Sequence, residues 1–240
     1  MKKERFLSLF IFCLSLSLLQ AQPPGSSGPF KPKERRAPSL GALEKKNLAK
    51  LLVGRARQRL EEKEWKKAYG LLKKAQSLDP KNGEIYRLLG DSYVLCQNRR
   101  KALLAYRQAV KVDPTSAENW MALGLEEEHL NMAKRALESF KEATLLSPTA
   151  QSWYHLGLAY MNLNRFNEAL YPLEKAAHLD PGLIEARHTL GLCYEKLGKK
   201  EAAHQAFSKA YLLNPTNATL QQNIARITKS PAQPPSKDKP

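Results

Sequence analysis

The sequence lacks the motifs on which most enzymes build a catalytic site. It contains no glycine-rich phosphate loop and no G-x-S-x-G nucleophile turn. Its five histidines (129, 155, 178, 188 and 204) include no pair four residues apart, the spacing that places two metal ligands on one helical face. Glu126, Glu127 and Glu128 are adjacent, so their carboxylates fan around a helix instead of converging. We therefore expect no catalysis, no cofactor, no bound metal and no small-molecule substrate.

Long hydrophobic runs are also absent. The longest, FLSLFIFCLSLSLL, covers residues 6–19, which is 14 residues, whereas a membrane-spanning helix needs about 20. Lys2, Lys3 and Arg5 precede it, and Gln20 and Ala21 follow it. A basic start, a short apolar run and a small residue at the end are typical of a secretory signal. Residues 1–21 therefore predict export, and an uncleaved membrane anchor is the alternative.

Cysteine is scarce. Beyond residue 21 the chain has only Cys96 and Cys193, too few for a disulfide framework even in an oxidising compartment. Both fall within helical patterns, so we expect buried thiols. This scarcity and the short Lys-rich signal favour a bacterial periplasm or cell envelope, with secretion as an alternative. Asn217-Ala218-Thr219 would be a glycosylation site only in a eukaryotic host.

Positive charge is abundant but unevenly distributed. The formal net charge is +16, and residues 49–82 carry ten Lys or Arg against four Asp or Glu. In residues 117–149 the balance reverses, with three basic against six acidic residues. A basic end favours acidic partners such as lipid headgroups, polyanions or acidic protein, although a solvated basic face that aids solubility explains it equally well. Nucleic acid is not expected as a partner, because the chain has no recognition motif for it.

The two ends of the chain differ in composition from its middle. Residues 22–38 (QPPGSSGPFKPKERRAP) and 230–240 (SPAQPPSKDKP) are rich in Pro, Gly, Ser and charge. Such segments bury too little apolar surface to offset their ordering entropy, so we predict a disordered linker and a disordered tail. The intervening sequence is helical in pattern throughout.

The middle of the chain repeats itself. WMALGLEE at 120–127, WYHLGLAY at 153–160 and RHTLGLCY at 187–194 are near copies. In the first half of each unit an aromatic residue, Leu-Gly and Tyr recur at i, i+3, i+4 and i+7, which places them on one helical face. In the second half Ala, a large apolar residue and Ala recur at i, i+4 and i+7. Each unit closes on a proline, at Pro80, Pro114, Pro148, Pro181 and Pro215, with intervals of 34, 34, 33 and 34.

This pattern resembles the tetratricopeptide repeat family, whose signature is W-x2-L-G-x2-Y…A-x3-F…P with a 34-residue period. The resemblance covers roughly residues 49–215. It implies an all-α, right-handed α-solenoid of about five helix-turn-helix repeats, at about 49–82, 83–116, 117–149, 150–183 and 184–217, within residues 39–215. We expect residues 40–52 to lengthen the first helix and residues 216–229 to form a C-terminal capping helix.

The copies also depart from the signature. The first unit is degenerate, Glu127 replaces a tyrosine and Arg187 a tryptophan, and one residue is missing after Pro148. Pro172 lies inside a second helix, where we expect it to remove one backbone hydrogen bond without ending the helix. Asn131, Asn164 and Gly198 stand between the two halves of their units, where a turn with positive φ suits them.

In this family the first helices of the units line a concave groove that holds ligands. Residues one step past each packing position are rotated about 100° from it. Met and Leu among aromatics suit the apolar face of a partner peptide or helix. The alternative is that these side chains only pack between neighbouring helices. The predicted groove residues are Arg87, Asp91, Met121, Leu125, Glu128, Tyr154, Leu158, Met161, His188, Leu192 and Glu195.

We therefore predict an exported, non-catalytic scaffold that binds a peptide or partner helix in this groove. Arg87 with Asp91 and Met121 with Leu125 differ from the Lys and Asn pairs with which some family members hold a C-terminal carboxylate, so we do not expect that mode. The alternative function is an envelope or membrane-surface adaptor whose basic N-terminal part binds anionic lipid or polymer. Its predicted residues are Lys31, Lys33, Arg35, Arg36, Lys45, Lys46, Arg55, Arg57 and Arg59.

Overall fold

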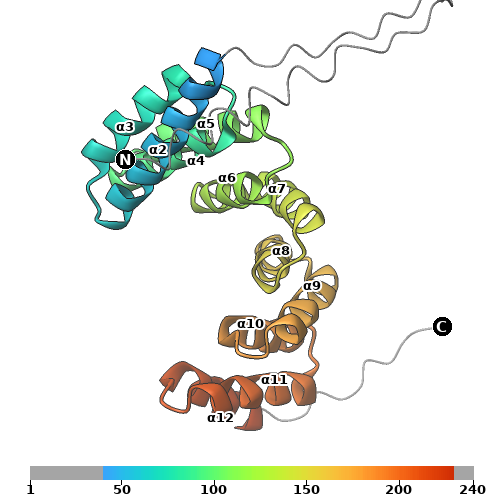
Figure 1. Cartoon of the computed structure of the whole chain (residues 1–240). Coiled ribbons are helices and arrows are strands. Elements are labelled where there is room, and N and C mark those ends of the chain that lie inside the picture. The colour runs from blue at the N-terminus through green and yellow to red at the C-terminus, as the bar shows by residue number, and fades with distance from the viewer. Residues whose placement is uncertain (1–39, 230–240) are drawn as a thin grey trace, which may run out of the picture. The chain divides into compact units, whose positions relative to one another are not determined.

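The computed structural model describes residues 40–229, which are helical with no strand (Figure 1). The predicted signal, linker and tail and the four basic residues between Lys31 and Arg36 lie outside this range. Consecutive helices pack in pairs, and the last helix packs on the fifth pair. The helices are α2 (Leu40–Glu61), α3 (Trp65–Leu78), α4 (Gly83–Leu95), α5 (Arg99–Val112), α6 (Ala117–His129), α7 (Ala133–Leu146), α8 (Ala150–Asn162), α9 (Phe166–Leu179), α10 (Ile184–Lys196), α11 (Lys200–Leu213) and α12 (Ala218–Lys229).

This arrangement confirms the all-α repeat fold. The segment 40–52 does lengthen the first helix, since α2 begins at Leu40 and continues to Glu61. The last helix of the described residues, α12, packs on α11 through Leu220 and Ile227.

Side-chain caps and left-handed turns set the helix boundaries. Asn98 accepts a hydrogen bond from the Lys101 amide at the start of α5, and Thr149 and Ser152 form a reciprocal capping box at the start of α8. Asn131 and Asn164 adopt φ of 58° and Gly198 a φ of 72°, which confirms the predicted turns. Lys63 and Gln97 adopt the same left-handed conformation at φ of 59° and 60°, although neither residue type favours it.

The C-cap of each second helix stands directly before the closing proline of its repeat, at Asp79, Asp113, Ser147, Asp180 and Asn214. A proline disfavours helical φ and ψ in the residue that precedes it, so the helix stops there. Pro172 does not end α9, which runs on to Leu179, as predicted.

The core of the second to fifth repeats contains a close contact between a glycine and a large side chain. A Cβ added to Gly124 in α6 would lie 2.7 Å from Phe140 in α7, and one added to Gly191 in α10 would lie 2.6 Å from Phe207 in α11. Both rings are fully buried. The Leu-Gly element of the repeat therefore lets the two helices of a pair approach closely.

The two cysteines differ from each other. Cys193 is buried, and burial raises the pKa of its thiol to about 11. Cys96 is only half-buried at the end of α4, so the prediction of a buried thiol is wrong there. Cys96 is the C-cap of α4, so it stands at the end of the helix and not within its packed part.

Candidate functional site

The first helices of neighbouring repeats pack side by side, except between α6 and α8. Contacts join α2 with α4, α4 with α6 and α8 with α10. Within residues 40–229 no pair of second helices packs as closely. Side chains on the first helices therefore line the surface that several repeats share, and this surface contains two hollows.

The first hollow lies between α2 and α4 and has a volume of about 450 Å³. Its lining is largely apolar, with charged groups at its rim. Tyr106 of α5 closes its floor and donates a hydrogen bond to the Asp91 carboxylate at 2.7 Å. The lining residues are Arg57, Leu60, Glu61, Arg87, Leu88, Asp91, Val94, Leu95 and Tyr106.

The second hollow lies between α4, α6 and the start of α8, with a volume of about 430 Å³. Met121, Ala122 and Leu125 give it an apolar side, while Glu118 and Gln151 are exposed at its edge. The remaining lining residues are Arg87, Asp91, Ala117, Ala143, Ser147, Thr149 and Ser152.

Arg87 and Asp91 belong to both hollows and therefore join them. We call the two together the first-helix groove. The Arg87 guanidinium lies 3.4 Å from the Asp91 carboxylate and 3.9 Å from that of Glu84. Burial raises the pKa of Asp91 above its ordinary value, opposed by the hydrogen bond from Tyr106 and the charge of Arg87. The groove therefore combines two apolar hollows with an ion pair between them.

The second hollow coincides with an irregularity in the repeat. Four residues separate α5 from α6, Asp113 to Ser116, but only Ser147, Pro148 and Thr149 separate α7 from α8. This is where the 34-residue period shortens to 33, and Ser147 and Thr149 line the hollow. The pairs α2–α4, α4–α6 and α8–α10 pack together, whereas α6 and α8 do not pack in this way.

The structure brings only part of the predicted groove residues together. Arg87, Asp91, Met121 and Leu125 surround the second hollow. Glu128 lies at the other end of α6, where its carboxylate accepts a hydrogen bond from Asn162 at 2.7 Å. Burial raises the pKa of Glu128 in spite of this bond.

The predicted residues on α8 and α10 are engaged within the chain. Tyr154 and Met161 pack against the core cluster around Leu173, and Leu192 packs against the cluster around Phe207. Leu158 is half-buried. The two polar predictions contact the last helix: His188 bonds Asn223 at 2.9 Å, and Glu195 pairs with Arg226 at 2.9 Å.

Sequence reasoning missed several lining residues because its rule considered only one helix at a time. Leu60 of α2 and Tyr106 of α5 enter the first hollow, and Gln151 enters the second from α8. A repeat alignment places Leu60 at the column of Val94, which offered a signal for that residue. Nothing in the repeat pattern marks Gln151, since its place depends on the short connector.

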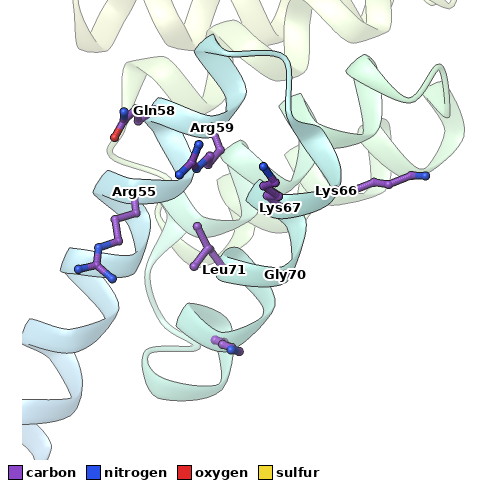
Figure 2. Close-up of a pocket in the computed structure, with 8 residues that line it drawn as sticks. Arg55, Gln58, Arg59, Lys66, Lys67, Gly70 and Leu71 are labelled. Carbon is purple, nitrogen blue, oxygen red and sulfur yellow. The ribbon is translucent and has the colours of Figure 1, made fainter.

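The predicted basic residues are partly described. Lys45 and Lys46 are exposed near the start of α2, and Arg57 forms an ion pair with Glu84. Arg55 and Arg59 line a third hollow of about 570 Å³ between α2 and α3 (Figure 2). The other residues of this hollow are Gln58, Lys66, Lys67, Gly70, Leu71 and Lys74.

Comparison with known protein families identifies the type of these repeats. Models described as tetratricopeptide repeat match residues 59–125, 150–183 and 184–217, which together make up more than half of the chain. The chain belongs to the tetratricopeptide repeat family. Members of this family mediate protein–protein interactions, so protein partners are the general expectation for it.

Three particular proteins illustrate the similarity. Human superkiller complex protein 3 is 28% identical over 67% of this chain, but the match spans only 11% of that protein's length. The crystal structure of MamA is 27% identical with a TM-score of 0.62, covering 68% of this chain and 96% of MamA. The structure of YrrB, described as a tetratricopeptide repeat protein with an unusual peptide-binding site, is 22% identical with a TM-score of 0.65 and covers 77% of this chain and 96% of YrrB.

The described residues contain neither a membrane-spanning helix nor a cluster of metal ligands. Between residues 40 and 229 no helix has the length and hydrophobicity needed to cross a bilayer. In the same range no three His, Cys, Asp or Glu side chains come together as metal ligands would.

Proposed function

We propose that the protein is a non-catalytic scaffold of the cell envelope that binds an extended or helical peptide of a partner protein in the first-helix groove. The observation that carries this proposal is the second hollow, where Met121, Ala122 and Leu125 offer an apolar surface next to the charged Arg87–Asp91 pair. An apolar side chain of the peptide would occupy the hollow, and polar groups of its backbone would meet the rim.

The pair of charges supports recognition of a peptide in preference to a purely apolar ligand. Arg87 can donate to a backbone carbonyl, and Asp91 can accept from a backbone N–H. Gln151, exposed on the opposite side, offers both a donor and an acceptor. The two hollows are continuous through Arg87 and Asp91, so one peptide can place a side chain in each.

A displayed library of random peptides tests this proposal. Peptides selected on the full chain are expected to carry apolar residues and to lose affinity by about tenfold or more for Met121→Glu, since a charge would enter the apolar hollow. Leu104→Glu is the matched control, because Leu104 is 64% exposed on the second helix α5, away from the groove. Selected peptides that bind Met121→Glu and wild type equally would refute the proposal.

An insertion tests the geometry of the same hollow. Adding one glycine after Pro148 restores a 34-residue interval, which we expect to bring α8 closer to α6 and to weaken binding of the selected peptides. Circular dichroism checks that helix content is kept. Undiminished binding by the insertion variant would show that the short connector does not shape the site.

Export is part of the proposal. Its support is the signal-like segment 1–21, read from the sequence. Expression in a bacterial host followed by fractionation and mass measurement of the mature protein tests it. A chain that is recovered from the cytoplasm with residues 1–21 intact would contradict export, and an intact chain in the membrane fraction would favour the uncleaved anchor.

A second candidate function is attachment to an anionic lipid or polymer surface by the basic N-terminal part. It is favoured by the exposure of Lys45 and Lys46 at the start of α2. Each such residue can add about 1 kcal/mol of binding energy at an anionic surface, and salt weakens the effect. Sedimentation with neutral and anionic vesicles at low and high salt measures it, and equal binding to both kinds of vesicle would count against it.

A further inference from the structure

The third hollow occupies the place that a preceding repeat would fill. In later repeats the second helix of one repeat packs against the first helix of the next, as α3 does on α4 and α9 on α10. The first repeat, α2 and α3, has no repeat before it among residues 40–229. The hollow between α2 and α3 therefore lies on the side of the first repeat where a second helix packs in the later repeats.

Equivalent positions in later repeats identify the surface. Ser92 stands 34 residues after Gln58, and its hydroxyl donates to the Trp65 carbonyl at the start of the preceding second helix at 3.2 Å. Likewise the Cys193 thiol donates to the Phe166 carbonyl at 3.2 Å. Gln58 thus faces the unfilled position. Leu71 corresponds to Ala105, which packs against the core of the repeat before it.

The hollow is basic over one part of its length. Arg55, Lys66 and Lys74 form no ion pair within the described residues, whereas Arg59 and Lys67 both contact the Glu64 carboxylate, at 2.9 and 2.6 Å. In every later repeat the position that corresponds to Arg55 is a leucine: Leu89, Leu123, Leu156 and Leu190. Figure 2 shows Arg55 and Arg59 on α2 and Leu71 and Lys67 on α3 among the residues that line this hollow.

The same surface also has an apolar part. Leu48 and Leu51 lie on the face of α2 that carries Arg55, because they precede it by seven and four residues. Their exposed fractions are 48% and 51%. A terminal surface built only for solubility would present polar groups here. Half-exposed leucines on the same face of α2 as the unpaired Arg55 favour a surface that binds a further helix.

We propose that an acidic amphipathic helix of a partner protein docks on this surface, in the position of a preceding second helix. Its apolar side contacts Leu48, Leu51 and Leu71, and its carboxylates face Arg55, Lys66 and Lys74. This interaction is separate from peptide binding in the first-helix groove, which lies on the shared face of the first helices.

Charge decides between this partner and other occupants. Residues 1–38 of the chain carry seven Lys or Arg against two Glu, so they would be repelled from the hollow. A second copy of the chain brings a net charge of +16. An anionic membrane would satisfy the charge, but a flat surface does not enter a hollow between two helices.

The test uses a synthetic peptide with the sequence of α7, a natural second helix, constrained as a helix by a staple on its polar face. In the acidic peptide, Glu replaces the residues that correspond to Lys134, Arg135 and Lys141. In the basic peptide, Lys replaces those that correspond to Glu138 and Glu142. Fluorescence anisotropy measures the affinity of each peptide for the full chain at low and high salt.

The acidic peptide is expected to bind, more weakly at high salt, and the basic peptide is not. Combining Arg55→Glu with Lys74→Glu should lower the chain's affinity for the acidic peptide by about tenfold or more and allow the basic peptide to bind. Lys111→Glu with Lys209→Glu is the matched control, since both residues are exposed elsewhere and the net charge changes equally. Leu51→Asp should also weaken binding, unlike Leu145→Asp on the exposed side of α7.

Three results would overturn the proposal. The first is equal affinity for the acidic and basic peptides. The second is an equal loss of affinity in the control variant. The third is binding to phosphatidylserine vesicles that Arg55→Glu with Lys74→Glu abolishes while the acidic peptide shows no binding, because the surface would then serve a membrane. Met121→Glu must leave the acidic peptide's affinity unchanged, which keeps this test independent of the first-helix groove.

Discussion

The contact between Arg99 and Glu126 allows a specific prediction about how the second and third repeats are held together. Glu126 is 2% exposed, at a position that the neighbouring repeats fill with Ser92, Ala159 and Cys193, all of them buried. Arg99 at the start of α5 donates to its Oε2 at 2.8 Å, and its Oε1 has no hydrogen-bond partner. A buried carboxylate that depends on one arginine should be sensitive to the loss of that arginine.

Arg99→Met leaves the Glu126 carboxylate desolvated and without its partner. Breaking a fully buried ion pair costs about 3–5 kcal/mol. The Arg99 side chain is 41% exposed, so water can partly replace it, and we expect a loss of about 2–3 kcal/mol in the free energy of unfolding. Glu126→Ala, which copies the fourth repeat, removes the buried charge and should change stability by only about 1 kcal/mol.

Urea unfolding followed by far-ultraviolet circular dichroism measures all four members of the double-mutant cycle. In the Glu126→Ala background Arg99→Met should cost less than about 0.5 kcal/mol, so that the coupling is about 2 kcal/mol. If Arg99→Met alone costs less than about 0.5 kcal/mol, the carboxylate is solvated or otherwise paired, and the reasoning is wrong.

Three further predictions concern packing, pH and turns. Gly124→Ala should destabilise the protein by about 1–2 kcal/mol, because overpacking against Phe140 outweighs the gain in helix propensity. Gly54 has open space around it, so Gly54→Ala should stabilise the protein by about 1 kcal/mol. Thermal unfolding of both variants checks this, and a stabilising Gly124→Ala would contradict it. Burial lowers the pKa of His155, so as the pH falls His155 is protonated in the unfolded chain before it is protonated in the folded chain. The free energy of unfolding should therefore fall as the pH drops below about 6.5. His155→Phe should lose less stability on acidification than wild type in urea unfolding across this pH range, and an unchanged pH dependence would count against it. Lys63→Gly should stabilise by about 1 kcal/mol, because it relieves a left-handed conformation at φ of 59°; an increase in the urea midpoint is the expected sign.

The repeat pattern predicted most of the fold because each repeat contacts mainly its neighbours. Tyr106, Phe140 and Phe207 recur at fixed distances from Gly90, Gly124 and Gly191, and each of these side chains lies against its glycine. Such contacts are local in sequence, so spacing alone predicts them. The left-handed turns at Lys63 and Gln97 were missed because a single residue type is a weak signal for that conformation.

The candidate site was predicted only in part. Met121 and Leu125 were found because they follow packing positions on the same helix. Tyr154, Met161 and His188 satisfy the same rule, yet they contact helices further along the chain. A rotation of 100° identifies the edge of a helix but not whether a neighbour covers it.

The sequence by itself determined the helical repeats, their boundaries and the basic character of the first repeat. The repeat period, the closing prolines and the positions of charged residues are all properties of the sequence alone. Tertiary structure alone decided which parts of the repeated surface stay open. A connector one residue shorter between α7 and α8 accompanies an open hollow beside Met121, and the absence of a described repeat before α2 leaves another beside Arg55. Both depend on how far one helix lies from the next, and that distance is set by packing between repeats, which no single repeat encodes.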